Sequence, residues 1–387
     1  MGDPVLSQAY ADEVLSVGRA AGLHRVGIAS AEPFDQARRA LDERAAAGLS
    51  ATMAFTYRNP ARSTDPAATL AGVAALVVGA RHYGRPRPPV PAGTEVAARV
   101  ARYATADHYG ALRAGLGQVA ARLRQDGWQA RVLADDNALV DRAAAQRAGL
   151  GWYGRNANVL VPGVGSWVVL GSVLTDAPLP VATTEVPDGC GACTRCLSGC
   201  PTGAIVAPGV VDARRCLAWM VQAEGVFPAE HRVALGDRLY GCDDCQEVCP
   251  ASRPGVEPVD EGRPADEPPV DDPGSWVDVL DLLACDDAAL LERYGRWYIP
   301  RREARYLRRN ALVVLGNSGR GGHPAVRAAL AVALAHDDPL VRAHAVWAAR
   351  RLGLAELVSP VSGDSDPLVR AELDRPVLVA PGREVAP

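Results

Sequence analysis

The spacing of the cysteines constrains this chain most, because eight of the nine fall between Cys190 and Cys249. A first run reads Cys-x2-Cys-x2-Cys-x3-Cys-Pro, and a second run reads Cys-x2-Cys-x3-Cys-Pro. In chain order the eight are Cys190, Cys193, Cys196, Cys200, Cys216, Cys242, Cys245 and Cys249. Three closely spaced thiolates suit one four-iron cluster, and a cysteine followed by proline ligates a second cluster, as in two-cluster ferredoxins. We therefore expect two 4Fe-4S clusters and transfer of single electrons.

Zinc and disulfide bonds are the alternative explanations for these cysteines. Zinc sites commonly use two separated pairs of ligands, often with histidine, whereas no histidine lies among these cysteines. Disulfide frameworks are typical of short secreted chains, while this sequence has 387 residues and no recognisable signal peptide. Clusters account for the spacing best, with zinc as the remaining alternative. The ninth cysteine, Cys285, lies in a helical pattern and is expected to be a buried core thiol.

Composition narrows the remaining possibilities. The net charge of −4 gives the whole chain no attraction to nucleic acid, so any such contact must be local. No apolar run is long enough to span a membrane. Cysteines kept reduced for clusters, without an export signal, predict a cytoplasmic protein. A length of 387 residues predicts two or three domains.

The chain divides into four parts, which together predict an α+β multidomain protein. Residues 1–187 alternate helical and strand patterns, which predicts an α/β domain whose sheet is covered on its faces. Residues 188–253 form a ferredoxin-like domain with little hydrophobic core. Residues 254–274 are proline-rich and acidic, which predicts a solvated linker. Residues 275–387 are predicted to be helical.

Hydrophobic periodicity predicts the individual elements. The expected strands are His24–Ser30, Val73–Ala80, Gln129–Ala134 and Ser166–Leu174, and the expected helices are Ala9–Ala21, Tyr109–Gln125 and Leu139–Ala148. In the last part, Pro-x-Val-Arg recurs from Pro324, Pro339 and Pro367. Proline at a helix start before an apolar stripe is typical of stacked helical pairs, so HEAT-like repeats are expected, with an ordinary helical cap as the alternative.

Two further segments contain candidate functional residues. The glycine-rich stretch 149–158 lets the backbone approach a ligand closely, although many such turns only reverse the chain. Asp135 and Asp136 follow a predicted strand at its carboxyl end, where α/β sheets place ligands. A turn or a helix cap is the alternative role for this pair.

Taken together, these motifs resemble those of one family along nearly the whole chain. The segments Cys190–Ile205, Asp212–Cys216 and Tyr240–Pro250 are similar to the cluster motifs of the epoxyqueuosine reductase family. The resemblance extends in family order to Val26–Ser30, Tyr57–Pro60, Arg102–Ala104, Ala148–Gly154, Gly165–Trp167 and Leu307–Ala311.

The resemblance implies a cobalamin-dependent oxidoreductase that reduces epoxyqueuosine to queuosine at the wobble position of tRNA. Electrons from an external low-potential donor would pass through two 4Fe-4S clusters to cobalamin. One cluster would be held by Cys190, Cys193, Cys196 and Cys249, and the other by Cys200, Cys216, Cys242 and Cys245. The implied cobalamin contacts come from Arg58, Tyr103, Asp135, Asn158, Gly165 and Ser166. Because the chain has no Asp-x-His-x-x-Gly motif, no histidine is expected as a lower cobalt ligand.

The resemblance also implies that Asp135 is the proton donor. Opening an epoxide leaves a basic alkoxide, and a carboxylic acid under an apolar corrin ring keeps its proton because desolvation raises its pKa. The sequence departs from the family around this position. Asp135 is followed by Asp136-Asn137-Ala138 without the usual proline, His108-Tyr109 is exchanged relative to the family, and Arg155 replaces a lysine.

An arginine-rich segment, Tyr294–Asn310, suggests a nucleic-acid contact. In it, or directly before it, lie Arg293, Arg296, Arg301, Arg302, Arg305, Arg308 and Arg309, interleaved with aromatic residues. This mixture suits phosphate contacts and base stacking, with a solvated helix face as the alternative. The resemblance favours a tRNA anticodon stem-loop as partner. We also expect a monomer that makes no contact with a membrane. The alternative functions are reduction of another epoxide or an organohalide by a related reductase, and plain electron transfer.

Overall fold

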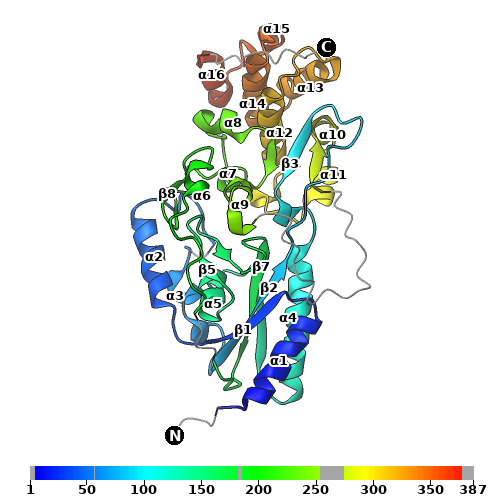
Figure 1. The fold of residues 1–387 in the computed structure, drawn as a ribbon. Coiled ribbons are helices and arrows are strands. Elements are labelled where there is room, and N and C mark those ends of the chain that lie inside the picture. Colours follow the sequence, from blue (N-terminus) through cyan, green and yellow to red (C-terminus); the bar gives the residue numbers. More distant parts are fainter. Residues whose placement is uncertain (1–4, 56, 182–184, 253–273, 377–387) are drawn as a thin grey trace. The chain divides into compact units, whose positions relative to one another are not determined.

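The structure is a computed structural model that describes residues 5–55, 57–181, 185–252 and 274–376. The chain groups into two compact units, each built from several segments (Figure 1). The first unit is Met1–Pro86, Ala106–Arg214 and Asp243–Asp271, and the second is Arg87–Thr105, Arg215–Cys242 and Asp272–Pro387. Apart from Gly274, the linker predicted at residues 254–274 lies outside the described residues.

A four-stranded sheet forms the centre of the first unit. Its order is β1 (Arg25–Ser30), β2 (Ala75–His82), β7 (Val168–Thr175) and β4 (Ala130–Ala134). All four strands were predicted, with small differences at their ends. Every neighbouring pair is antiparallel, so the rule that places ligands at the carboxyl ends of parallel strands does not apply here.

Helices cover both faces of this sheet. On one face, α4 (His108–Gln125) lies over two glycines that are paired across neighbouring strands, Gly79 of β2 and Gly171 of β7. A Cβ atom at either position would lie within 3.1 Å of Leu116 of α4, so the missing side chains allow this close approach. On the other face Gly27 meets the C-terminal end of α5 (Asp141–Arg147), where a Cβ on Gly27 would lie 2.3 Å from the carbonyl oxygen of the C-cap residue Ala148.

The other elements of the first unit are short or peripheral. Its helices also include α1 (Gln8–Ala20), α2 (Asp35–Ala46), α3 (Pro60–Ser63), α5 (Asp141–Arg147), α6 (Arg195–Ser198) and α9 (Asp244–Glu247). Its two small hairpins are β5 (Trp152–Tyr153) with β6 (Val159–Leu160), and β8 (Ile205–Ala207) with β9 (Val210–Val211). The helices α6 and α9 have one turn each and lie within the two cysteine runs.

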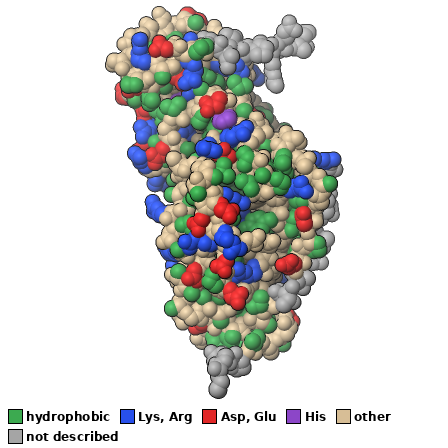
Figure 2. Space-filling view, turned by 90° about the vertical axis from the view of Figure 1, so that its left-hand side faces the viewer, with side chains coloured by type: hydrophobic (Ala, Val, Ile, Leu, Met, Phe, Trp, Pro, Cys, Tyr) green, Lys and Arg blue, Asp and Glu red, His purple; other side chains and the backbone are tan. Residues whose placement is uncertain are grey.

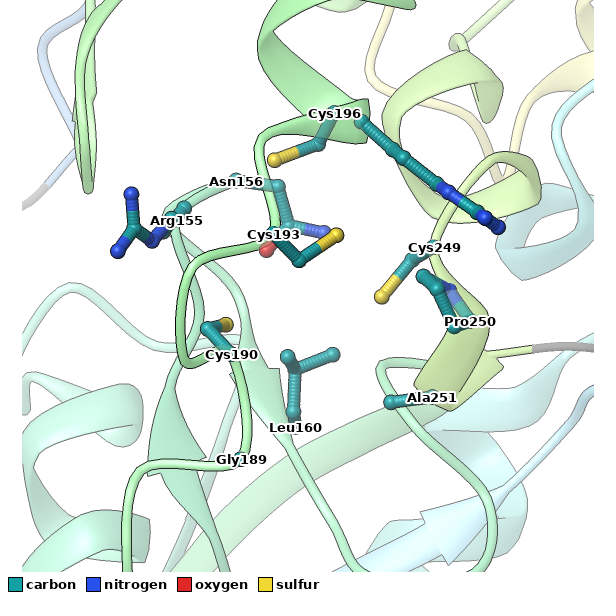
Figure 3. A pocket seen from close by; sticks show the side chains of 11 residues that line it. Arg155, Asn156, Leu160, Gly189, Cys190, Cys193, Cys196, Cys249, Pro250 and Ala251 are labelled. Carbon is teal, nitrogen blue, oxygen red and sulfur yellow. The ribbon is translucent and has the colours of Figure 1, made fainter.

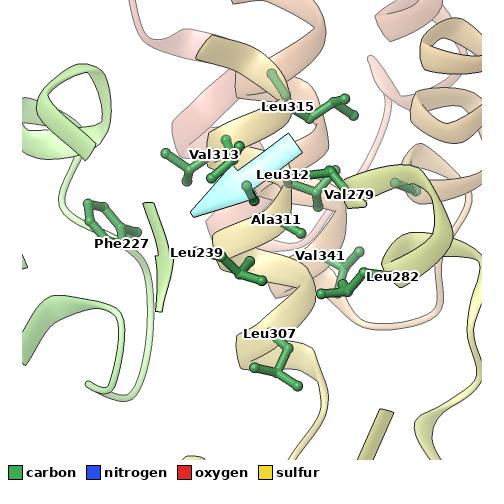
Figure 4. Close-up of a cluster of buried hydrophobic side chains, with 14 of the residues drawn as sticks. Phe227, Leu239, Val279, Leu282, Leu307, Ala311, Leu312, Val313, Leu315 and Val341 are labelled. Atoms are coloured by element: carbon green, nitrogen blue, oxygen red, sulfur yellow. The ribbon is translucent and has the colours of Figure 1, made fainter. Parts of the chain in front are cut away.

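The second unit is mainly helical and has its own core (Figure 4). Its helices are α7 (Leu217–Met220), α8 (Ala229–Leu235), α10 (Val279–Ala284), α11 (Asp287–Tyr294), α12 (Arg305–Asn317), α13 (Pro324–Leu334), α14 (Pro339–Arg351), α15 (Ala355–Val358) and α16 (Pro367–Asp374). A small sheet has the order β10 (Arg238–Tyr240), β3 (Ala97–Val100) and β11 (Trp276–Asp278).

Helix α12 lies at the centre of this core, and every residue from Tyr306 to Gly316 is buried. The three Pro-x-Val-Arg motifs begin α13, α14 and α16, where proline supplies a helical φ and lacks only an N–H that would be unpaired. Within the described part of the chain, no helix is both long and apolar enough to cross a membrane.

Candidate functional site

Four cysteines from two distant segments line one cavity of the first unit (Figure 3). Cys190, Cys193 and Cys196 come from the first run, and Cys249 comes from the end of the second run. The Cys-Pro arm of one run therefore meets the three thiols of the other. Four thiols around one cavity fit the ligand set of a 4Fe-4S cluster.

Local hydrogen bonds shape the loop that carries these thiols. The Cys190 N–H donates to Oδ1 of Asp188 at 2.8 Å, and the Cys193 N–H donates to the Cys190 carbonyl at 3.0 Å. Gly191 has φ 49°, and its carbonyl accepts a hydrogen bond from Nη2 of Arg155 at 2.5 Å. The guanidinium of Arg155 thus lies beside the cavity, where it offsets part of the negative charge that thiolate ligands bring.

The protonation of the Cys196 thiol depends on its surroundings in this cavity. Burial raises the pKa of this thiol, and the neighbouring thiols, above all that of Cys249, act in the same direction. Iron binds the thiolate, so cluster assembly must displace the proton of this thiol.

The other four cysteines are divided between the two units. Cys200 and Cys245 belong to the first unit, and Cys216 and Cys242 belong to the second. The sulfur of Cys200 accepts the N–H of Ala204 at 3.2 Å, a hydrogen bond of the kind that tunes cluster ligands. Their assignment to one second cluster stays a prediction from the sequence.

Asp135 follows β4 directly and has an unusual backbone. Its φ is 54°, a left-handed conformation that Asp and Asn adopt more readily than most residues. Arg113 of α4 holds the preceding residue, because its Nη2 donates to the carbonyl of Ala134 at 3.0 Å. The Asp135 side chain keeps contact with solvent. Desolvation by the surrounding atoms nevertheless raises the pKa of its carboxyl, with Arg113 opposing the shift and Asp136 adding to it.

Asp136 has a different role in the same turn. Its Oδ1 accepts the backbone N–H of Ala138 at 2.9 Å, which is the hydrogen bond of an Asx turn. This carboxylate therefore shapes the loop that carries Asp135. A turn was the alternative role considered for the acidic pair, and Asp136 has that role.

The structure adds two groups that the sequence did not single out as acids near Asp135. Asp141 begins α5, and its Oδ1 is buried without a hydrogen-bond partner among the described residues. Burial raises the pKa of Asp141 well above its usual value, and the charge of Asp135 raises it further. Burial also raises the pKa of Tyr109, followed by the charges of Asp135 and Asp141. Asp141 and Tyr109 therefore lie near enough to Asp135 for its charge to raise the pKa of both.

The residues expected to contact cobalamin fall into two groups. Arg58, Asp135 and Asn158 lie in the first unit, and no side-chain hydrogen bond is found for them within the described residues, so these side chains are free to contact a bound group. Tyr103 lies in the second unit, where its hydroxyl accepts a hydrogen bond from Gln222 at 3.1 Å.

Gly165 and Ser166, also expected at cobalamin, bind the turn to the segment after Cys249. The hydroxyl of Ser166 is buried and hydrogen-bonds to Gln246 at 3.0 Å and to Ser252 at 3.1 Å. Gly165 has φ +63°, and a Cβ there would lie 2.4 Å from the carbonyl oxygen of Ala251. These two residues therefore connect the turn before β7 with the segment that carries Cys249.

The interpretation of the segment Tyr294–Asn310 as a phosphate-binding surface is wrong for two of its arginines. Arg308 and Arg309 are 6% and 0% exposed, because α12 is surrounded by the core on all sides. Exposed groups remain at the turn before α12, where Arg301 and Arg302 have φ values of 50° and 57°. On the face shown in Figure 2, basic side chains lie interspersed with acidic ones.

Residues 189–252 match the family model described as "4Fe-4S double cluster binding domain". Together with the four-thiol cavity, this match defines a two-cluster iron–sulfur protein. The epoxyqueuosine reductase of Xanthomonas campestris is 34% identical over 355 residues, which cover 89% of this chain and 96% of that relative. The chain belongs to the epoxyqueuosine reductase family.

Solved structures agree over nearly the full length. A crystal structure of epoxyqueuosine reductase with an epoxyqueuosine-modified tRNA-Tyr stem loop has a TM-score of 0.83 at 26% identity, covering 94% of this chain and 97% of that one. A structure of the Bacillus subtilis epoxyqueuosine reductase, with its catalytic aspartate loop swung out of the active site, has a TM-score of 0.82 at 27% identity, covering 94% and 97%.

Proposed function

We propose that this protein reduces epoxyqueuosine to queuosine at the wobble position of tRNA. The observation that carries the proposal is the convergence of Cys190, Cys193, Cys196 and Cys249 on one cavity, in a chain that belongs to this family. The likeness to a reductase structure that holds a modified tRNA stem loop supports the substrate. The 34% identity to an epoxyqueuosine reductase favours this substrate over an organohalide or a different epoxide.

The reaction consumes two electrons and two protons and releases the epoxide oxygen as water. Two clusters suit this demand because each passes single electrons. The first cluster is held by Cys190, Cys193, Cys196 and Cys249, and the second by Cys200, Cys216, Cys242 and Cys245. Cobalamin, when bound, supplies a low-valent cobalt that engages the substrate.

Asp135 donates the proton to the oxygen of the opened epoxide. Its carboxyl has a raised pKa and no competing hydrogen bond among the described residues, so a substantial part remains protonated at higher pH than for an ordinary Asp. The catalytic aspartate loop of the Bacillus subtilis relative can leave the active site. The positive φ of Asp135 fits a loop of this kind, since strained backbone is frequent at functional sites.

The side chains of Arg58, Asp135 and Asn158 contact cobalamin, with the backbone of Gly165 and Ser166 nearby and Tyr103 as a further contact that the family resemblance implies. The hydroxyl of Ser166 already hydrogen-bonds to Gln246 and Ser252, which favours a contact through the backbone of this residue.

The finer domain layout belongs to the same proposal. Residues 1–187 bind cobalamin and substrate, residues 188–253 form the ferredoxin-like domain, and residues 275–387 form HEAT-like repeats that begin at their prolines. The tRNA contacts come from the exposed turn with Arg301, Arg302 and Tyr298, the last of which is 59% exposed and able to stack on a base. The protein acts as a cytoplasmic monomer that receives electrons from an external low-potential donor.

A deletion strain tests the proposed function in the cell. Mass spectrometry of the nucleosides from its tRNA should show epoxyqueuosine accumulating and queuosine lost, with both reversed by the wild-type chain but not by a Cys193→Ala chain. Unchanged queuosine in the deletion strain would contradict the proposal.

A further inference from the structure

Arg309, in the first turns of α12, is fully buried and makes no ion pair with a carboxylate among the described residues. Its donors go instead to backbone carbonyls of one segment. Nη1 donates to Ala223 at 2.6 Å and to Gly225 at 2.8 Å. Nη2 donates to Met220 at 3.1 Å and to Val221 at 3.2 Å. A single side chain therefore fixes the path of residues 220–225.

Asn310, the next residue of α12, extends this network to a second segment. Its Oδ1 accepts from Nε of Arg309 at 3.0 Å, and the residue is fully buried. Its Nδ2 donates to the Val221 carbonyl at 2.9 Å and to the Leu239 carbonyl at 3.2 Å. One amide group thus joins the end of α7 to strand β10.

Both joined segments carry a cysteine of the second ligand set, and all of these residues belong to the second unit. Cys216 is the N-cap residue of α7, and its carbonyl accepts the N–H of Met220 at 2.9 Å. Cys216 is therefore one helical turn from the carbonyl that Arg309 binds. Cys242 follows β10 closely and packs against the core that surrounds α12.

A purely structural contact at this position would not require a charge. Burying a cation without a partner anion is unfavourable, and apolar side chains often replace buried charges without loss of stability. Carbonyl groups at the end of a short helix offset part of that cost, because they form the negative end of the peptide dipoles. The network instead provides defined geometry, since each hydrogen bond specifies a distance and a direction.

We infer that Arg309 and Asn310 are positioning residues that hold Cys216 and Cys242 at the separation that the second cluster requires. This inference rests on the proposed ligand set of that cluster. It gives a role to the Leu307–Ala311 motif, and it connects the C-terminal helices with electron transfer. Ligation by these cysteines would then depend on a helix far from them in sequence.

The test compares Arg309→Met with Arg308→Met in anaerobically purified full-length protein. Arg308 is the matched control, because it is a buried neighbour on the same helix that binds Cys285 and Asp287 instead. Arg309→Met should retain about four of about eight irons per chain and lose the electron paramagnetic resonance signal that Cys216→Ala also loses. Arg308→Met should retain both clusters.

Asn310→Ala provides a milder perturbation if Arg309→Met does not fold. It should release the iron of the second cluster to a chelator about 10-fold faster than wild type, while the first cluster is released at the wild-type rate. Wild-type iron content and release in either folded variant would overturn the positioning role. If Cys216→Ala itself kept all its iron, the ligand set, and with it part of the proposed function, would be wrong instead.

Discussion

Replacing Asp135 with Asn asks whether this carboxyl donates the proton. Asn tolerates the φ of 54° as well as Asp does, and no hydrogen bond of the Asp135 side chain is lost among the described residues. The substitution therefore removes the acidic proton and leaves the loop in place. General acids contribute about 10²–10⁴-fold to a rate, so turnover should fall by at least about 10²-fold while both clusters and cobalamin remain bound.

Asp136→Asn is the matched control for this substitution. The Oδ1 of an Asn at position 136 can still accept the Ala138 N–H, so the turn persists and turnover should stay close to the wild-type rate.

The assay is single turnover on epoxyqueuosine tRNA with a chemical reductant, followed by mass spectrometry of the nucleosides. An inactive Asp136→Asn beside an active Asp135→Asn would reverse the assignment. Full activity of both would remove this pair as the acid and leave Asp141, whose Oδ1 is buried, as the nearby carboxyl to test.

Four further predictions concern pH, iron, packing and cobalt. Because desolvation raises the pKa of Asp135, with Asp136 adding to it, the proton-donating form should be lost as pH rises through that pKa. Turnover should fall there, and Asp135→Asn should lack this limb of the pH profile; a wild-type rate without it would contradict the role. Cys193→Ala should lose the first cluster and Cys216→Ala the second, each keeping about four of eight irons, whereas stoichiometric zinc in the wild type would refute the cluster assignment. Gly165→Ala should destabilise the protein by about 1–3 kcal/mol because the added Cβ would clash with Ala251, in addition to the strain of a positive φ. Gly163→Ala is the control, because Gly163 also has a positive φ but a Cβ there would have no atom within 4 Å. Equal effects of the two substitutions on chemical denaturation would show that the clash contributes nothing. The Co(II) form of bound cobalamin should show no nitrogen hyperfine splitting from an axial base, and such splitting would reveal a lower ligand that the sequence did not predict.

The sequence predicted which segments of the first unit form strands but not how they pair. Alternating and continuous apolar runs report burial of a strand, and β2 is indeed buried along most of its length. Strand direction depends on the paths of the connections, which leave no local pattern. The contact of Leu116 with Gly79 and Gly171 could not be predicted either. Neither glycine indicates from the sequence that it pairs with the other, because the contact exists only once β2 and β7 lie side by side.

The candidate site was predictable where the chemistry is local in sequence. Cysteine spacing predicted the four thiols that line one cavity, whereas the other four ligands and the role of Asp135 stay predictions from the sequence. Asp141 escaped notice because an acid at a helix start is ordinary, and only its burial distinguishes it. Arg308 and Arg309 were misinterpreted because composition cannot separate a solvated arginine from one that binds buried carbonyls. Their position directly before Asn310 and the apolar run Ala311–Leu315 was the available signal.

Conversion of epoxyqueuosine tRNA by the purified protein tests the central claim most directly. Protein reconstituted with iron, sulfide and cobalamin and supplied with a low-potential reductant should turn epoxyqueuosine into queuosine, a product lighter by one oxygen atom. Protein carrying Cys193→Ala should not do so. Epoxyqueuosine that persists unchanged with fully loaded wild-type protein, while another substrate is reduced, would contradict the account.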